Sequence, residues 1–161
     1  ASLPAGSGVI LRHYTDPRRH HLAEELARLC RERRIIFLVA GDGRLARKVG
    51  ADGIHFPEYK TPEALRWSLK HPGWLVTSAA HSKKAIILAS QFGVNAVLVG
   101  PVFSTSSHPG ANYLGPTQFA SLCQAAGTEL AVYALGGLTD KTAPLIIRSR
   151  AAGIAGISGL R

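Results

Sequence analysis

The sequence contains no methionine, only two cysteines and no long apolar run. Because Cys30 and Cys123 stand alone, we expect a reducing compartment, and hence the cytoplasm, rather than a disulfide framework; a single bridge between them stays open. A transmembrane helix would need about eighteen consecutive apolar residues, so none is predicted. The start of the chain lacks the basic segment and apolar core of a signal peptide. Since position 1 is not methionine, we expect the front of the chain to have been trimmed.

Acidic residues are also scarce: there are 10, against 19 lysines and arginines, which gives a formal net charge of +9. Such a charge is compatible with a nucleic-acid partner. However, the arginines cluster within residues 28–34 and are otherwise scattered, without interleaved aromatics or zinc-ligand spacing. A positive field attracts phosphorylated metabolites equally well. We therefore expect small phosphorylated substrates as partners, and neither nucleic acid nor membrane. A homo-oligomer stays open.

The chain has 161 residues, 46% of them hydrophobic, which fits a single domain spanning residues 1–161. Short apolar runs typical of buried strands alternate with helical patterns throughout. Strands are predicted at residues 8–14, 35–40, 53–56, 74–78, 95–99, 129–135 and 154–158, and helices at 17–33, 44–49, 61–71, 81–92, 117–126 and 140–150. Three helix-to-strand joints are alike, VGADGIHF, FGVNAVLVG and AAGIAGISG, which indicates one repeated βα unit.

Strict alternation of strand and helix gives either an open doubly wound sheet or a (βα)8 barrel. No glycine-rich dinucleotide fingerprint follows the first strand, where Arg12, His13 and Tyr14 stand, so the α/β class is narrowed to the (βα)8 TIM barrel. A barrel of this class has eight strands, whereas the sequence predicts seven and ends at the last one. We expect this chain to lack the first strand and the last helix of the barrel.

One loop is rich in hydroxyl groups. The predicted strand 95–99 breaks at Gly100 and Pro101 into a segment with four hydroxyl residues and a histidine at positions 104–108. Hydroxyls and polar side chains can hold a phosphate by hydrogen bonding, and the carboxyl end of a barrel strand is the usual place of an active site. An ordinary surface loop is the alternative interpretation.

A glycine pair, Gly136 and Gly137, ends the strand 129–135. Glycine lets the backbone approach an anion closely, and we expect Asp140 to cap a helix whose positive end lies nearby. Loops after the seventh and eighth strands of such barrels commonly hold phosphate. A plain tight turn is the alternative here.

Four segments resemble the thiamine phosphate synthases and their sister group, the thiazole tautomerases: GADGIHF, GVNAVLVGPVFSTSSHPGANYLGP, AVYALGGLTDKTAP and AAGIAGISGL. The resemblance covers nearly the whole chain, from the second barrel strand of the family to the eighth. It implies a (βα)8 barrel that joins hydroxymethylpyrimidine diphosphate to a thiazole phosphate, with magnesium and basic residues holding the pyrophosphate.

The resemblance also assigns roles to residues at matching positions. The thiazole phosphate would be bound by the polar ends of the last three strands, and the glycine pair would face it. His108 would steady the leaving group, and Arg12 would meet the pyrophosphate. The expected phosphate-binding set is Thr105, Ser107, Gly136, Gly137, Ile157 and Ser158.

Several positions depart from the family. Tyr14 stands where the synthases have lysine, and Ile10 where they have glutamine. Ala40 and Gly41 replace an asparagine–aspartate pair that binds diphosphate and magnesium. The second metal aspartate falls on Lys60, the serine after the fifth strand on Ala79, and the catalytic histidine of the tautomerases on Pro101.

Asp42 and Glu58 lie close in sequence to the lost ligands, and we name them as candidate magnesium ligands, since one or two carboxylates plus substrate phosphates can hold this ion. Solvated loop acids are the alternative. The sequence therefore predicts a thiamine phosphate synthase-like transferase with Arg12 and His108 as catalytic residues. The alternative is a family member that has lost the magnesium ligands and binds or isomerises a thiazole phosphate, with His108 or His81 as general base.

Overall fold

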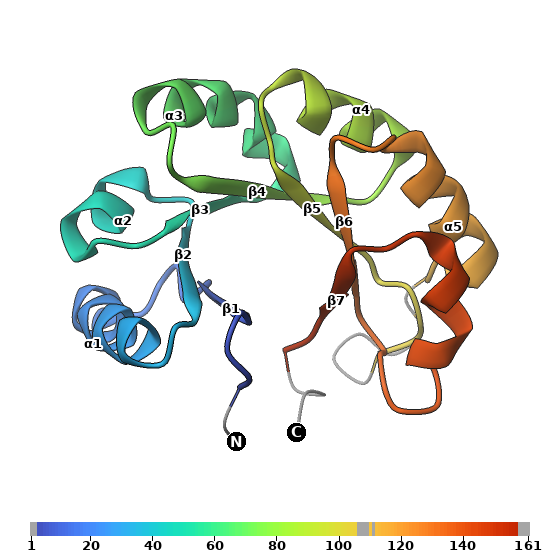
Figure 1. The fold of residues 1–161 in the computed structure, drawn as a ribbon, viewed down its shortest axis with the longest axis horizontal. Coiled ribbons are helices and arrows are strands. Elements are labelled where there is room, and N and C mark those ends of the chain that lie inside the picture. Colours follow the sequence, from blue (N-terminus) through green and yellow to red (C-terminus); the bar gives the residue numbers. More distant parts are fainter. Residues whose placement is uncertain (1–2, 106–109, 111, 158–161) are drawn as a thin grey trace.

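A curled parallel sheet with helices on its outer side is the frame of the molecule (Figure 1). The computed structural model describes residues 3–105, 110 and 112–157. The strands are β1 (Gly8–Leu11), β2 (Ile36–Ala40), β3 (Gly53–Phe56), β4 (Leu75–Ala80), β5 (Ala96–Val99), β6 (Ala131–Leu135) and β7 (Gly153–Ala155). The helices are α1 (Arg19–Glu32), α2 (Gly43–Val49), α3 (Ala64–Lys70), α4 (Lys83–Gln91) and α5 (Gly115–Ala125), with the 3-10 helices η1 (Glu58–Glu63) and η2 (Ala143–Ser149).

The strand order confirms the predicted barrel class. Each strand pairs in parallel with the next strand along the chain, in the order β1 to β7. A doubly wound sheet would reverse its order at a switch point. Among the described residues the sheet has two edges, β1 and β7, and it curls around its inner face (Figure 1). A cavity lies along that face.

Helix boundaries follow the capping groups that the sequence offers. Asp42 accepts hydrogen bonds from the first backbone N–H groups of α2, and Ser82 accepts one from the N–H of Ala85 in α4. Gly50 ends α2 in the left-handed conformation. The predicted start of the first helix at Pro17 was wrong, because residues 16–19 form a turn and α1 begins at Arg19.

The main core lies between the sheet and the helices. Strand side chains that point outward are large and fully buried, such as Val39, Ile54 and Val97, and Phe119 of α5 packs in the same core. Burying one such side chain contributes about 1.5–3 kcal/mol. The large buried side chains that stabilise the fold therefore lie on the outer side of the sheet.

The inner side of the sheet carries small residues among larger ones. One row of paired positions runs His55, Thr77, Ala96 and Ala131, and the next runs Ala79, Leu98 and Tyr133. TIM-barrel interiors are usually filled by layers of bulky branched side chains. Here a cavity of about 650 Å³ lies along the inner face, and these alanines line part of it.

None of the described helices combines the length with the apolar character that a membrane crossing requires.

Candidate functional site

The central cavity runs along the inner face of the sheet, from the amino ends of the strands to their carboxyl ends. Barrels carry their active sites at the carboxyl ends. Its walls are mostly apolar, and a few polar groups converge on it. Such a lining suits a small organic ligand. The polar residues on the wall are Ser7, Arg12, Tyr14, His55, Glu58, Tyr59, Thr77, His81, Asn95 and Tyr133. The predicted residue Arg12 thus lies at the cavity, one position beyond the end of β1.

His55 of β3 is the most deeply placed ionisable group of the cavity wall. Its side chain is buried, and its Nδ1 lies 2.9 Å from Thr77 Oγ1 on the adjacent strand β4. Burial, together with the positive charge of Arg12, lowers the pKa of His55 from 6.5 to about 4. Sequence reasoning missed this residue. The only signal was a histidine within an otherwise apolar strand.

Glu58 and His81 form a carboxylate–imidazole pair at the mouth of the cavity. Glu58 Oε2 lies 2.7 Å from His81 Nδ1, and it also accepts a 2.7 Å hydrogen bond from the backbone N–H of His81. Both side chains are partly exposed. A base held by a carboxylate can take up or release a proton. The sequence named both residues, but it did not indicate that they form a pair.

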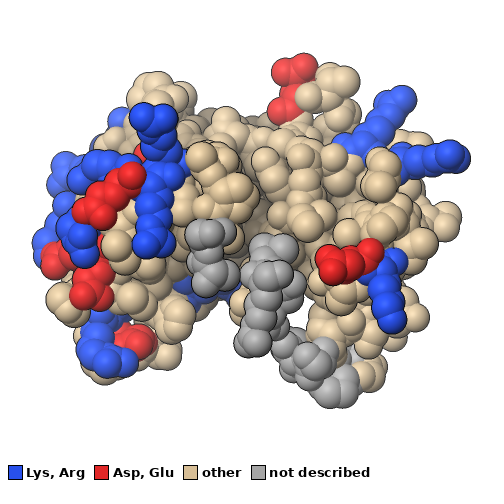
Figure 2. Space-filling view, turned by 60° about the horizontal axis from the view of Figure 1, so that its bottom comes forward, with Lys and Arg blue, Asp and Glu red and all other residues tan. Residues whose placement is uncertain are grey.

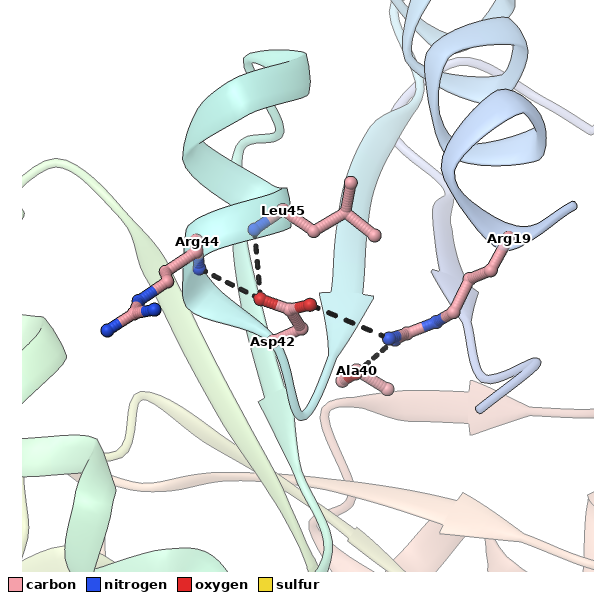
Figure 3. Close-up of polar contacts among 5 residues, drawn as sticks. All are labelled: Arg19, Ala40, Asp42, Arg44 and Leu45. Carbon is pink, nitrogen blue, oxygen red and sulfur yellow. Dashed lines mark hydrogen bonds and ion pairs between the residues drawn. The ribbon is translucent and has the colours of Figure 1, made fainter. Parts of the chain in front are cut away.

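Asp42 is held in a different network, on the outer side of the β2 end (Figure 3). Its Oδ1 accepts hydrogen bonds from the N–H groups of Arg44 and Leu45, at 3.0 and 2.9 Å. Its Oδ2 lies 3.9 Å from Nη1 of Arg19, and the other terminal nitrogen, Nη2, donates to the carbonyl of Ala40. Asp42 does not line the central cavity.

A preformed magnesium centre is not found in the described part of the chain. No three His, Cys, Asp or Glu side chains lie together there as metal ligands would. Asp42 is engaged as a cap and with Arg19, while Glu58 is engaged with His81. Magnesium binding by Asp42 and Glu58 together with substrate phosphates stays a prediction.

The loops after β5 and β6 meet at the glycine pair. Gly136 and Gly137 have φ values of 95° and 66°. A Cβ atom on Gly137 would lie 2.4 Å from the carbonyl oxygen of Ser104, and one on Gly136 would lie 3.4 Å from Thr105 Cγ2. Only glycine therefore lets the two loops approach, and this contact places Thr105 beside the glycine pair.

The remaining predicted phosphate ligands lie near the end of β7 or outside the described residues. Ile157 follows β7 and lines the central cavity. Ser107, His108 and Ser158 lie outside the described residues. The structure thus brings Thr105 together with Gly136 and Gly137, and places Ile157 on the cavity wall.

The expected helix start at Asp140 was wrong. The segment after the glycine pair is a turn, in which Thr142 Oγ1 donates a 2.9 Å hydrogen bond to the carbonyl of Gly137 and accepts one from the N–H of Thr139. The following helix is the seven-residue 3-10 helix η2, which begins only at Ala143. A helix dipole at Asp140 therefore does not support phosphate binding here.

Basic side chains gather away from this site. In the space-filling view of Figure 2, lysines and arginines are densest on the side of the molecule that carries α1 and α2. A second hollow, of about 290 Å³, lies there near Arg31, Arg34 and Asp52. It lies at the amino end of β2, opposite the end at which barrels carry their active sites. The central cavity is therefore the candidate site.

The fold and the central cavity define a βα-barrel protein with an active-site-like cavity that reaches the carboxyl ends of its strands. The sequence matches the family described as thiamine monophosphate synthase over residues 3–160, and the chain belongs to this family. The resemblance predicted from the four sequence segments is thereby confirmed.

Several relatives give the extent of the similarity. The putative thiamine-phosphate synthase 2 of Aquifex aeolicus is 32% identical over 143 residues, which cover 89% of this chain and 75% of that protein. The thiamine-phosphate synthase of Coprothermobacter proteolyticus is 30% identical, covering 82% of this chain and 62% of the relative. The thiamine-phosphate synthase of a Synechococcus species is 29% identical, covering 99% of this chain and 46% of the relative. The chain thus spans about half to three quarters of the length of these relatives.

A solved structure supports the fold. Thiamine phosphate pyrophosphorylase from Pyrococcus furiosus superposes with a TM-score of 0.76 at 21% identity, covering 94% of this chain and 72% of that one.

Proposed function

We propose that the protein is a thiamine phosphate synthase-type transferase, which couples hydroxymethylpyrimidine diphosphate with a thiazole phosphate. Family membership supports the class of reaction. The observation that carries the proposal is the contact of the β5 and β6 loops beside the cavity, with Thr105 next to the glycine pair. That arrangement supplies hydroxyl and backbone donors of the kind that bind phosphate.

In the proposed reaction, the bond between the pyrimidine methylene carbon and the diphosphate oxygen breaks first. The pyrophosphate leaves with the electron pair, and the thiazole nitrogen then donates its lone pair to the carbon cation. Arg12, on the cavity wall, neutralises the departing pyrophosphate. We assign His108 to the same leaving group, and Thr105, Ser107, Gly136, Gly137, Ile157 and Ser158 to the thiazole phosphate. No step is assigned to magnesium.

A second candidate is isomerisation of a thiazole phosphate, which needs proton transfer rather than pyrophosphate departure. One observation favours it: the Glu58–His81 pair at the cavity mouth, in which a carboxylate holds an imidazole. The similarity to synthases favours coupling over this alternative.

Incubation of the protein with both substrates, with and without magnesium, tests the proposal. We expect thiamine phosphate to form, detected by chromatography. Replacing Arg12 by glutamine should lower kcat about a hundredfold, the usual effect of losing one group that stabilises developing charge. Arg66→Gln, an exposed change on α3, is the matched control and should leave the rate unchanged. Isomerised thiazole phosphate without coupled product would contradict the proposal and favour the second candidate.

A further inference from the structure

The hollow at the amino end of β2 differs in character from the central cavity. Its volume is about 290 Å³, and among the described residues Ile36 alone lines both spaces. The charged residues on its wall are Arg31, Arg34 and Asp52. The buried apolar side chains that also line it are Ala27, Ile35 and Phe37. The hollow therefore combines both signs of charge with an apolar surface.

Arg34 has a backbone conformation that glycine usually takes. Helix α1 ends in a Schellman-type turn, in which the N–H of Ile35 donates a 2.9 Å hydrogen bond to the carbonyl of Cys30. The N–H of Arg34 donates a 3.3 Å hydrogen bond to the carbonyl of Arg31, and Arg34 has a φ of 56°. Glycine is the usual residue at this point, because the left-handed conformation strains a residue that carries a Cβ atom. An arginine kept there despite the strain points to a use for its side chain.

The two guanidinium groups of the hollow keep donors for an anionic group. Within the described residues neither Arg31 nor Arg34 forms an ion pair, and two acids of α1 pair with other basic side chains instead. Arg31 Nη2 lies 3.5 Å from the carbonyl oxygen of Gly50, which is a long hydrogen bond. A guanidinium has five N–H donors in a planar fork that matches a carboxylate.

Asp52 supplies a group of the opposite sign. Its Oδ2 accepts a 2.8 Å hydrogen bond from the backbone N–H of Phe37, which holds the carboxylate beside β2. Its Oδ1 has no hydrogen-bond partner in the part of the chain that the structure describes. This carboxylate repels a ligand that is only anionic, whereas it attracts a ligand that also carries an ammonium group.

We propose that this hollow binds an α-amino acid with an aliphatic side chain. Arg31 and Arg34 bind the carboxylate of the ligand, and Asp52 Oδ1 accepts a hydrogen bond from its ammonium group. The aliphatic side chain contacts the apolar surface that Phe37 and its neighbours provide. Pockets for drug-sized ligands measure about 300–1,000 Å³, so the volume of this hollow suits a smaller molecule. The site is separate from the proposed coupling reaction and does not depend on it.

Titration with leucine, followed through the backbone amide NMR resonances of Arg31, Arg34 and Phe37, tests the inference. Because exposed charge pairs are individually weak, we expect a dissociation constant of about 1 mM. Leucinamide lacks the carboxylate and 4-methylpentanoate lacks the ammonium group, so each should bind at least about fivefold more weakly. Binding of 4-methylpentanoate as tight as that of leucine would overturn the inference, as would the absence of leucine-dependent shifts in the hollow.

A glycine variant separates binding from folding. Arg34→Gly removes the guanidinium and relieves the backbone, so it should bind leucine about fivefold more weakly and unfold at a urea concentration no lower than the wild type does. Arg150→Gly is the matched control, because Arg150 also has a positive φ, of 65°, and does not line the hollow. This control should keep the leucine affinity of the wild type. Unchanged affinity in Arg34→Gly, or equal weakening in both variants, would overturn the inference.

Discussion

At the scale of single residues, the cavity wall carries one buried histidine, His55, whose pKa the fold lowers. His55 lies inside the sheet, and Thr77 on the neighbouring strand holds its ring. Charging this ring would cost desolvation energy and repulsion from Arg12, which is why its pKa is lowered to about 4. Folding is therefore coupled to the protonation of His55 in the unfolded chain.

This coupling predicts a pH-dependent stability. Between about pH 6.5 and 4 the unfolded chain binds a proton at His55 and the folded protein does not, so the free energy of unfolding falls as the pH falls. From pH 7 to pH 5 the loss from this group should be about 2 kcal/mol. Urea unfolding at several pH values measures it. In His55→Leu, the free energy of unfolding should lack this part of the pH dependence, whereas His21→Gln should keep it. The same pH dependence in the wild type and in His55→Leu would contradict the assignment.

The family resemblance set Thr105 and the glycine pair around one phosphate, and in the structure they lie together. Arg12, assigned to the pyrophosphate in the same way, lines the cavity. Their roles in binding stay predictions. His55 was missed because its partner Thr77 is 22 residues away and only the strand register joins them. The cap predicted at Asp140 failed because the hydroxyls of Thr139 and Thr142 bind the turn themselves.

At the scale of elements, Asp42, which the sequence named as a candidate magnesium ligand, is the N-cap of helix α2. Its carboxylate caps α2 and lies near Arg19 (Figure 3). Asp42→Ala should lower the free energy of unfolding by about 1 kcal/mol, whereas Asp42→Asn keeps a capping oxygen and should lose much less. Thermal or urea unfolding of both variants measures this. Unchanged stability in both, with loss of magnesium-dependent coupling, would instead identify Asp42 as a metal ligand.

The loop contact between β5 and β6 offers a second element-scale prediction. In Gly137→Ala, the alanine would have to adopt the left-handed backbone conformation. Its methyl group would also collide with the carbonyl oxygen of Ser104. Gly127→Ala is the matched control, because Gly127 has a φ of 69° but nothing within 4 Å of the added methyl group. We expect a loss of about 1 kcal/mol for the control, and of more than about 2 kcal/mol for Gly137→Ala. Equal losses in urea unfolding would show that the loops can separate without cost.

At the scale of the whole molecule, the layering was readable from the sequence, because alternating strands and helices predict a parallel sheet covered by helices. The barrel order of the strands needed a further observation, that no dinucleotide fingerprint follows the first strand. The cavity along the inner face was not predicted. Ala79, Ala96 and Ala131 line part of it, and the strand register brings them into adjacent rows, so their contribution appears only once the register is known.

The central claim is that the ends of β5, β6 and β7 bind one phosphate group at the mouth of the cavity. Titration of the protein with thiazole phosphate, followed through backbone amide NMR resonances, tests it most directly. The account predicts that the amides of Thr105, Gly136, Gly137 and Ile157 shift together with one dissociation constant. Shifts confined to the basic side of α1 and α2, around Arg31 and Arg34, would contradict it.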